Sequence, residues 1–499
     1  MRGHLKFMGR ALVVALVVAV CVSGAWKVLT LKAADSEDTS ASFENFYELE
    51  EDSVDVLFMG SSHVFQGFVP QELYDGYGIT SYNLGSSGQS IVLTYYWLEE
   101  ALETQSPEVV VLDVYKMFSE GLGCTEGNVR KALDYMRWGP AKVGAVEAVC
   151  ELDESLTEIS FYLPNVRYHD RWKELTVADF TSDEVAEVSE YYGYYYGYPS
   201  NYVDTPDEEF TPLVEGVSDE VAELAEPARE YLDRIVGLCE EEGIELVLVK
   251  TPAYYWTAAN HNAIVAYAEE HGLDFYDLNE EELYEELGFE LYEDTVDGRH
   301  ANLAGALKIT DYVGGLLSEE YGLEAHESAG WEEGREDYEK MADDYWLSSI
   351  DDAGEYLEAL AGGDDRYAVF IAVKGDASAV LGDGAVAAGL EGLGLSAGWE
   401  DAEGCSYLAV VDEGEVLCEE LSSEALEFTG SFQDGRLVCT VSSTGDLAGD
   451  AACDIMLEGS DEDVGGAGLN IVVYSNERQC VVDSVCFQAT DDGEVVAVR

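Results

Sequence analysis

The 499-residue sequence is poor in basic residues. It has 25 Lys and Arg against 103 Asp and Glu, a formal net charge of −78 at pH 7. A surface this acidic repels phosphate backbones and anionic lipid headgroups. Nucleic acid and an anionic membrane surface are therefore poor partners, and the charge itself is typical of a solvated acidic surface.

Metal-binding motifs are also lacking. The ten cysteines match no zinc spacing. Most of the six in the last hundred residues lie in apolar runs, so they can be buried thiols or the disulfides of an exported protein. Four histidines have no acidic or cysteine partner at metal spacing: His4, His261, His271 and His326. No metal and no cofactor is expected.

Long apolar runs are absent except at the N-terminus. Residues 11–26 are apolar and follow Arg2, Lys6 and Arg10, which is typical of a signal peptide or signal anchor. The run is short for a membrane span, and Ala33-Ala34-Asp35 offers a cleavage site. We expect residues 1–33 to be an uncleaved signal anchor in the cell membrane, with the bulk of the chain outside the cytoplasm.

A short apolar segment at residues 54–59 predicts a buried strand that ends in Gly60-Ser61-Ser62. Strands at 80–84, 109–114, 244–249 and 274–278 alternate with helical patterns, which predicts an α/β fold with five parallel strands in a flavodoxin-like order. Sites form at the carboxyl ends of such strands, where Ser62 is a candidate nucleophile.

A base for Ser62 is found 238 residues later. Asp297 and His300 stand three residues apart, ahead of an apolar helical pattern. Asp297 can orient the imidazole and stabilise its charged form, and His300 can take the Ser62 proton. His63 follows the nucleophile directly, and we interpret it as structural because neighbours at a sharp turn rarely point at each other.

These blocks resemble the SGNH (GDSL-type) esterases and acyltransferases over about residues 50 to 325. The family is marked by short sequence motifs, called blocks. The first block matches Gly60-Ser61-Ser62, the second matches Asn83-Leu84-Gly85-Ser86-Ser87-Gly88, and the last matches Asp297 with His300. The resemblance implies a three-layer SGNH fold, with the Ser62 and Gly88 amides forming the oxyanion hole. The chain departs from the family at Ser61, usually Asp, and at residues 109–117, where the block that supplies a side-chain amide is missing.

The Gly-Ser-Ser form resembles the branch that acylates cell-envelope polymers. It implies a serine esterase or O-acyltransferase that takes an acyl donor, an envelope glycan acceptor and a membrane acyl-export partner. The missing amide leaves an alternative open, a catalytically idle glycan-binding protein on the same scaffold.

Residues 118–205 interrupt the sheet pattern and predict a lid or binding region. Arg167, His169, Arg171 and Lys173 form a basic cluster that can hold an anionic substrate or make local ion pairs. The tyrosine run at 191–198 can stack on sugar rings or simply form a half-buried aromatic loop. Tyr254, Tyr255 and Trp256 follow the fourth strand and are expected near Ser62.

The remaining chain differs in composition. We expect the catalytic domain at 34–325, a charged helical linker at 326–364, and a β-rich module at 365–499. Residues 466–474 and 485–487 resemble the ILEI-type module, a small lectin-like fold, although the helix-containing half comes first here. The module can bind glycan or act as a spacer.

Overall fold

The computed structural model describes residues 2–29, 40–118, 124–163, 165–173, 175, 210–213, 216, 218–363, 366–396, 402–432, 437–476, 480–490 and 493–499. The chain divides into two compact units, Met1–Tyr338 and Glu339–Arg499. The tyrosine run at 191–198 lies outside the described residues, as does most of the expected lid.

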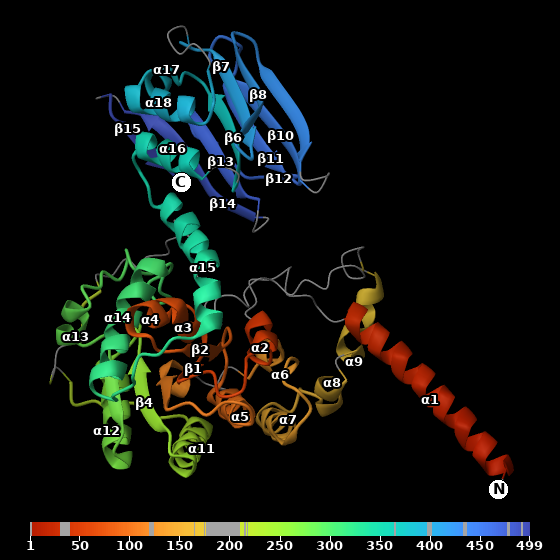
Figure 1. Ribbon diagram of the computed structural model, residues 1–499. Coiled ribbons are helices and arrows are strands. Elements are labelled where there is room, and N and C mark those ends of the chain that lie inside the picture. Colours follow the sequence, from red (N-terminus) through yellow and green to blue (C-terminus); the bar gives the residue numbers. More distant parts are fainter. Residues whose placement is uncertain are drawn as a thin grey trace. The chain divides into compact units, whose positions relative to one another are not determined.

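The first unit is built on a five-stranded parallel sheet with the order β2-β1-β3-β4-β5 (Figure 1). Its strands are β1 (Val56–Gly60), β2 (Ser81–Gly85), β3 (Val109–Asp113), β4 (Glu245–Lys250) and β5 (Asp274–Asp277). Every residue of β1, β2 and β3 is buried, because helices cover both faces of the sheet. The predicted α/β class and flavodoxin-like strand order are confirmed.

Helices pack on the two faces of this sheet. On one face α5 (Ile91–Ala101) contacts α11 (Glu226–Glu242), and on the other α4 (Pro70–Tyr77) contacts α14 (Leu303–Glu319) (Figure 1). Among the described residues between β1 and β5, the remaining helices are α3 (Ser62–Phe65), η2 (Tyr115–Phe118), α6 (Glu126–Leu133), α7 (Pro140–Leu152), α8 (Glu158–Tyr162), α9 (Asn165–Tyr168), η4 (His169–Lys173) and α12 (Ala258–His271). Helix α2 (Ser40–Phe46) precedes β1, and α13 (Glu281–Glu286) precedes α14.

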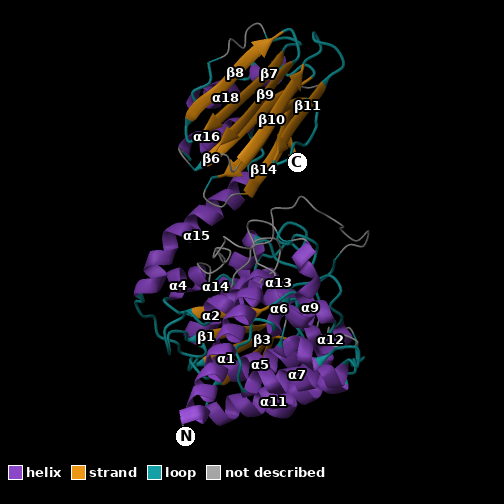
Figure 2. Cartoon of the chain, turned by 90° about the vertical axis from the view of Figure 1, so that its right-hand side faces the viewer, coloured by secondary structure: helices purple, strands orange, loops and turns teal. Residues whose placement is uncertain are grey.

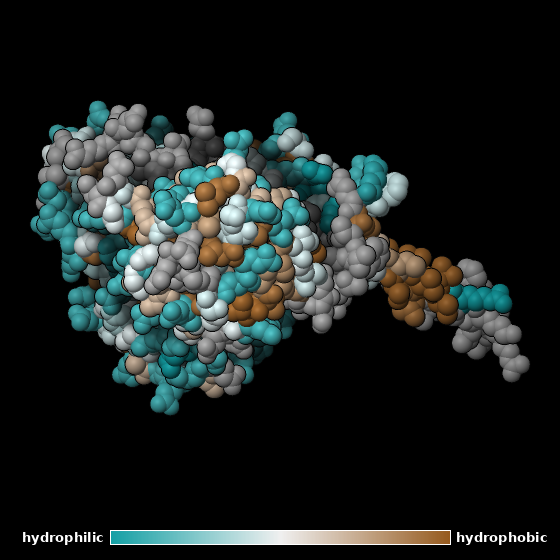
Figure 3. All heavy atoms as spheres, turned by 90° about the horizontal axis from the view of Figure 1, so that it is seen from above, coloured by the Kyte–Doolittle hydropathy of each residue, from teal (hydrophilic) through white to brown (hydrophobic). Residues whose placement is uncertain are grey.

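The N-terminal segment forms helix α1 (Arg2–Leu29), whose exposed valine and leucine side chains gather in one hydrophobic region (Figure 3). Among the described residues, however, no helix combines the length and apolarity that a membrane crossing requires. The uninterrupted apolar run between Arg10 and Lys27 is only 16 residues, short of the roughly 20 that span a bilayer. The predicted cell-membrane location with a single N-terminal anchor is therefore wrong.

The second unit contains a ten-stranded, mainly antiparallel sheet (Figure 2). Its strands are β6 (Tyr367–Lys374), β7 (Ser406–Asp412), β8 (Glu415–Ser422), β9 (Leu426–Phe432), β10 (Leu437–Thr444), β11 (Ala452–Leu457), β12 (Ser460–Asp461), β13 (Gly468–Ser475), β14 (Cys480–Ala489) and β15 (Val495–Val498). Alternate residues of β6 enter two cores. One forms with α16 (Ala353–Gly362), α17 (Ser378–Leu381) and α18 (Gly384–Gly392), and the other with β9, β10 and β11.

The boundary between the units falls inside helix α15 (Ala329–Ser348). The stretch predicted as a charged helical linker, 326–364, contains this boundary. Trp331 packs against Tyr74 of the first unit, whereas Tyr356 and Leu357 of α16 are buried in the core of the second. All ten cysteines are free thiols in the structure.

Candidate active site

Ser62 lies at the carboxyl end of β1, between β2 and β3. The strand ends at Gly60, whose φ of +152° suits glycine, and a Cβ there would come within 2.8 Å of Val64 and 3.2 Å of Asp113. Small residues therefore let the chain turn sharply from strand into α3. The half-buried Ser62 hydroxyl is left at the sheet edge where sites form.

The structure brings Ser62, His300 and Asp297 together. Ser62 Oγ lies 2.8 Å from His300 Nε2, and His300 Nδ1 lies 2.9 Å from Asp297 Oδ2. This is the connected order of nucleophile, base and orienting carboxylate that acyl transfer uses. It assigns Nδ1 the proton, so that Nε2 is free to accept from the serine.

Local hydrogen bonds in the loop before α14 place Asp297 under the imidazole. Residues Thr295 and Ala301 form an isolated bridge, and Gly298 makes the turn with a φ of +76°. Asp297 Oδ1 accepts from the backbone N–H groups of Arg299, at 3.1 Å, and His300, at 2.9 Å. The Asp297 carboxylate thus stabilises the turn of the Asp-x-x-His segment and at the same time bonds the His300 ring.

Asp297 is ionised in this setting. Burial alone would raise the pKa of its carboxyl, but the His300 hydrogen bond and charge and the Arg299 hydrogen bond lower the pKa well below its usual range. Arg299 donates from Nε to Asp297 Oδ2 at 2.7 Å. The carboxylate therefore stays charged throughout neutral and weakly acidic pH, as orienting the imidazole requires.

Two backbone amides near Ser62 are available for a developing oxyanion. Within the described chain, neither the Ser62 nor the Gly88 N–H donates a hydrogen bond. The Gly85 backbone lies against the end of β1, because a Cβ on Gly85 would come within 2.9 Å of the Ser61 carbonyl oxygen. Gly88 follows three residues later, with a φ of +71°.

Asn128 in α6 lies directly against Gly88. A Cβ on Gly88 would come within 2.4 Å of Asn128 Nδ2, so only glycine admits this approach. Sequence reasoning missed Asn128, since it stands forty residues beyond the second block and outside the position where the family carries its amide. A side-chain amide is therefore present beside Gly88, although residues 109–117 contain none.

His63 is buried and bonds residues of the loop after β4, not Ser62. Its Nδ1 lies 2.9 Å from Thr251 Oγ1 and its Nε2 lies 2.7 Å from Tyr255 OH, and the residue is 2% exposed. Burial lowers the pKa of His63 well below its ordinary value, and the charge of nearby Lys250 adds to this. A neutral His63 anchors the residue after the nucleophile to the loop after β4.

The predicted aromatic residues after β4 separate into two groups. Tyr254 donates its N–H to the Gly298 carbonyl at 3.0 Å, and Tyr255 bonds His63, so both lie beside the loop that carries the triad. Trp256 is buried and donates from Nε1 to Asp277 at 2.7 Å. Trp256 belongs to the interior and cannot contact a substrate from there.

The basic cluster at 167–173 makes local contacts. Arg167 bonds Glu126 at 2.8 Å, Lys173 bonds Asp170 at 2.9 Å, and Arg171 donates to the Leu29 carbonyl at 2.8 Å. The side chain of His169 lies outside the described residues. Of the two interpretations left open by the sequence, these contacts favour the local ion pairs.

Three buried charged residues that were not predicted as site residues lie at the same edge of the sheet as Ser62. Lys250, Asp113 and Asp277 stand at the carboxyl ends of β4, β3 and β5, and each is at most 3% exposed. Burial lowers the pKa of Lys250, whereas both carboxylates raise it. Asp113 Oδ2 has no hydrogen-bond partner in the described chain, and burial raises the pKa of this carboxyl.

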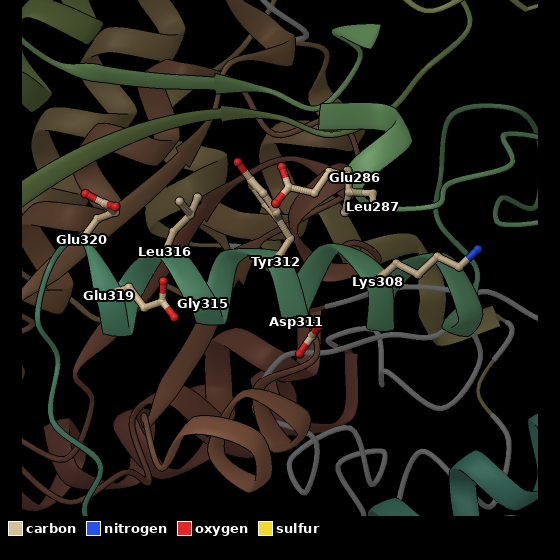
Figure 4. A pocket seen from close by; sticks show the side chains of 9 residues that line it. All are labelled: Glu286, Leu287, Lys308, Asp311, Tyr312, Gly315, Leu316, Glu319 and Glu320. Atoms are coloured by element: carbon tan, nitrogen blue, oxygen red, sulfur yellow. The ribbon is translucent and has the colours of Figure 1, made fainter. Parts of the chain in front are cut away.

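A separate hollow of about 350 Å³ is lined by α13 and α14 (Figure 4). Its lining carries acidic residues including Glu286, Asp311, Glu319 and Glu320, but no member of the triad. Lys308 at one end is already bonded to Asp294 at 2.7 Å. In the part of the chain that is described, no group of three His, Cys, Asp or Glu residues is arranged to hold a metal ion.

No family model and no curated protein matches the chain. Among solved structures it is similar to a gut microbial diltiazem-metabolizing enzyme, with 16% identity and a TM-score of 0.20. The match covers 54% of this chain and 48% of the other, about half the length of each.

Proposed function

We infer that the protein is a serine ester hydrolase or O-acyltransferase that works through an acyl-enzyme. The observation that carries this inference is the pair of hydrogen bonds joining Ser62, His300 and Asp297. Ser62 Oγ attacks the ester carbonyl while His300 Nε2 takes its proton. His300 then returns the proton to the departing alcohol, which leaves the acyl group on Ser62.

The second half-reaction reverses the roles. Water or a sugar hydroxyl gives its proton to His300 and attacks the acyl carbonyl, and Ser62 leaves with the proton. In both halves negative charge develops on the carbonyl oxygen. The Ser62 and Gly88 amides, which donate no hydrogen bond within the described chain, can receive it. We assign the Asn128 side chain, which lies against Gly88, as a third donor.

Replacing Asn128 with alanine is expected to lower kcat roughly 10²–10³-fold while leaving KM nearly unchanged, since an oxyanion donor acts only when the charge develops. Steady-state kinetics on 4-nitrophenyl acetate would measure this. Gly127→Ala is the matched control, because its Cβ would meet nothing within 4 Å and alanine favours the helix. A kcat loss under threefold for Asn128→Ala would remove the residue from the oxyanion hole.

The finer part of the proposal is acyl transfer to cell-envelope glycans. It is supported by the resemblance of Gly60-Ser61-Ser62 to the polymer-acylating branch and by Tyr254 and Tyr255, whose rings lie beside the triad loop. Transfer requires that an acceptor hydroxyl occupy the position from which water would attack. An aromatic surface beside Ser62 is suited to hold a sugar ring there.

Wall polymer from cells with and without the gene should distinguish the possible activities. A transferase leaves the deletion strain with fewer ester-linked acyl groups, which is the expected result, whereas a deacylase leaves it with more. An unchanged ester content, together with polymer binding by the purified protein, would favour the idle glycan-binding protein instead.

A further inference from the structure

Two cationic side chains, those of Arg299 and Lys116, have N–H groups that make no hydrogen bond within the described chain. Arg299 uses Nε for Asp297, and its side chain is 44% exposed. In the described chain, its Nη1 and Nη2 have no hydrogen-bond or ion-pair partner. Lys116 Nζ lies 4.6 Å from the centroid of the Tyr115 ring and, among the described residues, has no hydrogen bond or ion pair.

Both cations lie close enough to His63, the residue after the nucleophile, for their charges to lower its pKa. Arg299 stands between Asp297 and His300 in the triad loop. Lys116 follows Tyr115, whose ring lies 4.5 Å from that of His63, the residue after Ser62. The His63 and His300 rings are themselves 5.3 Å apart. The Lys116 and Arg299 charges act on each other as well, because Arg299 lowers the pKa of Lys116 after the larger effects of burial and of Asp113.

The neighbouring carboxylates do not occupy these donors. Asp297 is bonded to His300, Asp277 to Trp256 and His261, and Asp113 is only 3% exposed. Asp113 and Asp277 are buried, and Asp297 bonds His300 and only the Nε of Arg299, whose side chain remains 44% exposed. Such an arrangement is unusual in a chain with 103 acidic and 25 basic residues.

We propose that Lys116 and Arg299 form a subsite for an anionic group, a carboxylate or a phosphate, carried by the substrate whose ester reacts at Ser62. The free Nη1 and Nη2 can bind two oxygens of the anion side by side, and Lys116 adds a point charge. The acidic remainder of the surface repels polyanions at long range. The subsite therefore does not draw anionic substrates from solution, but favours the binding of an anionic substrate once it has reached Ser62. The proposal rests on the esterase function proposed above.

The test compares acetates of three-carbon alcohols that differ in one group. These are 1-acetylglycerol, 1-acetylglycerol 3-phosphate and the O-acetyl ester of glyceric acid, and 4-nitrophenyl hemisuccinate against 4-nitrophenyl butyrate probes the acyl side. The full-length protein should show a kcat/KM at least about tenfold higher for an anionic ester than for its neutral partner, as expected for charge-assisted hydrogen bonds. The preferred anion distinguishes phosphate from carboxylate.

Substitutions test whether the preference for anionic esters comes from Lys116 and Arg299. Lys116→Met and Arg299→Lys should each lower the ratio of anionic to neutral kcat/KM about tenfold, and added salt should lower the wild-type ratio. Lys173→Met removes the same charge from the basic cluster at 167–173. A similar loss of the ratio in Lys173→Met would make the preference a net-charge effect and overturn the subsite.

Failure of the subsite differs from failure of the esterase. Neutral esters turned over at Ser62 without any anionic preference would overturn the subsite and leave the esterase intact. Turnover of none of the five esters would overturn both.

Discussion

Alanine in place of Ser62 is expected to abolish ester turnover, lowering kcat roughly 10⁶-fold, and to abolish labelling by a fluorophosphonate. The reason is that Ser62 Oγ is the oxygen that lies 2.8 Å from His300 Nε2, so no other hydroxyl is activated by the triad. Gel fluorescence of the labelled protein and hydrolysis of 4-nitrophenyl acetate measure the two losses independently.

Ser61 offers a closely matched control. Its hydroxyl is buried beside the nucleophile and has no hydrogen-bond partner in the described chain, so Ser61→Ala removes a hydroxyl without breaking a bond. Most activity and full labelling should remain. Labelling that persists in Ser62→Ala, or disappears in Ser61→Ala, would mean that the nucleophile is misassigned.

Loss of His300 should be nearly as severe as loss of Ser62, whereas loss of the Asp297 charge should be milder. His300→Ala removes the group that carries the proton in both half-reactions, roughly a 10⁶-fold loss in kcat by analogy with other serine triads. Asp297→Asn keeps the shape but favours the wrong imidazole tautomer, and about 10⁴-fold is expected. Stopped assays over hours would resolve these residual rates.

The pH profile tests the same assignment. Because hydrogen bonds from His300 and Arg299 keep the pKa of Asp297 well below its usual range, Asp297 stays ionised as pH falls from 9 to 5. The loss of kcat/KM on the acid side should then contain no contribution from protonation of Asp297. Protonation of Asp297 within the acid limb, or equal losses in His300→Ala and Asp297→Asn, would contradict the division of roles.

Much of the first unit could be predicted because its strands are strongly apolar. Residues 54–59 and 109–114 are nearly uninterrupted hydrophobic runs, as strands buried on both faces require, and their alternation with helical patterns predicts a parallel sheet. The meeting of Ser62 with Asp297 and His300 follows from the same topology, since β1 and the loop before α14 both end at one edge of the sheet.

Other features left no local signal. Asn128 reaches Gly88 from α6, and the Tyr115 ring that Lys116 covers lies against His63, contacts that depend on tertiary packing. Strands β8 and β9 have a weak strand pattern in the sequence, because Glu415, Glu419, Glu420 and Glu427 interrupt their apolar positions. The basic cluster at 167–173 attracted attention by its charge, although Arg167 and Lys173 bond neighbouring acidic side chains.

The acidic residues of β8 and β9 have a consequence for how the protein behaves in concentrated solution. In the described chain, β8 pairs only with β7 and β9 only with β10, so each has one row of backbone N–H and C=O groups without a partner strand. Open edges of this kind seed the strand-to-strand stacking of fibrils, and like charges along them keep two copies apart. The solubility of the second unit therefore depends on the charges that these glutamates place along β8 and β9.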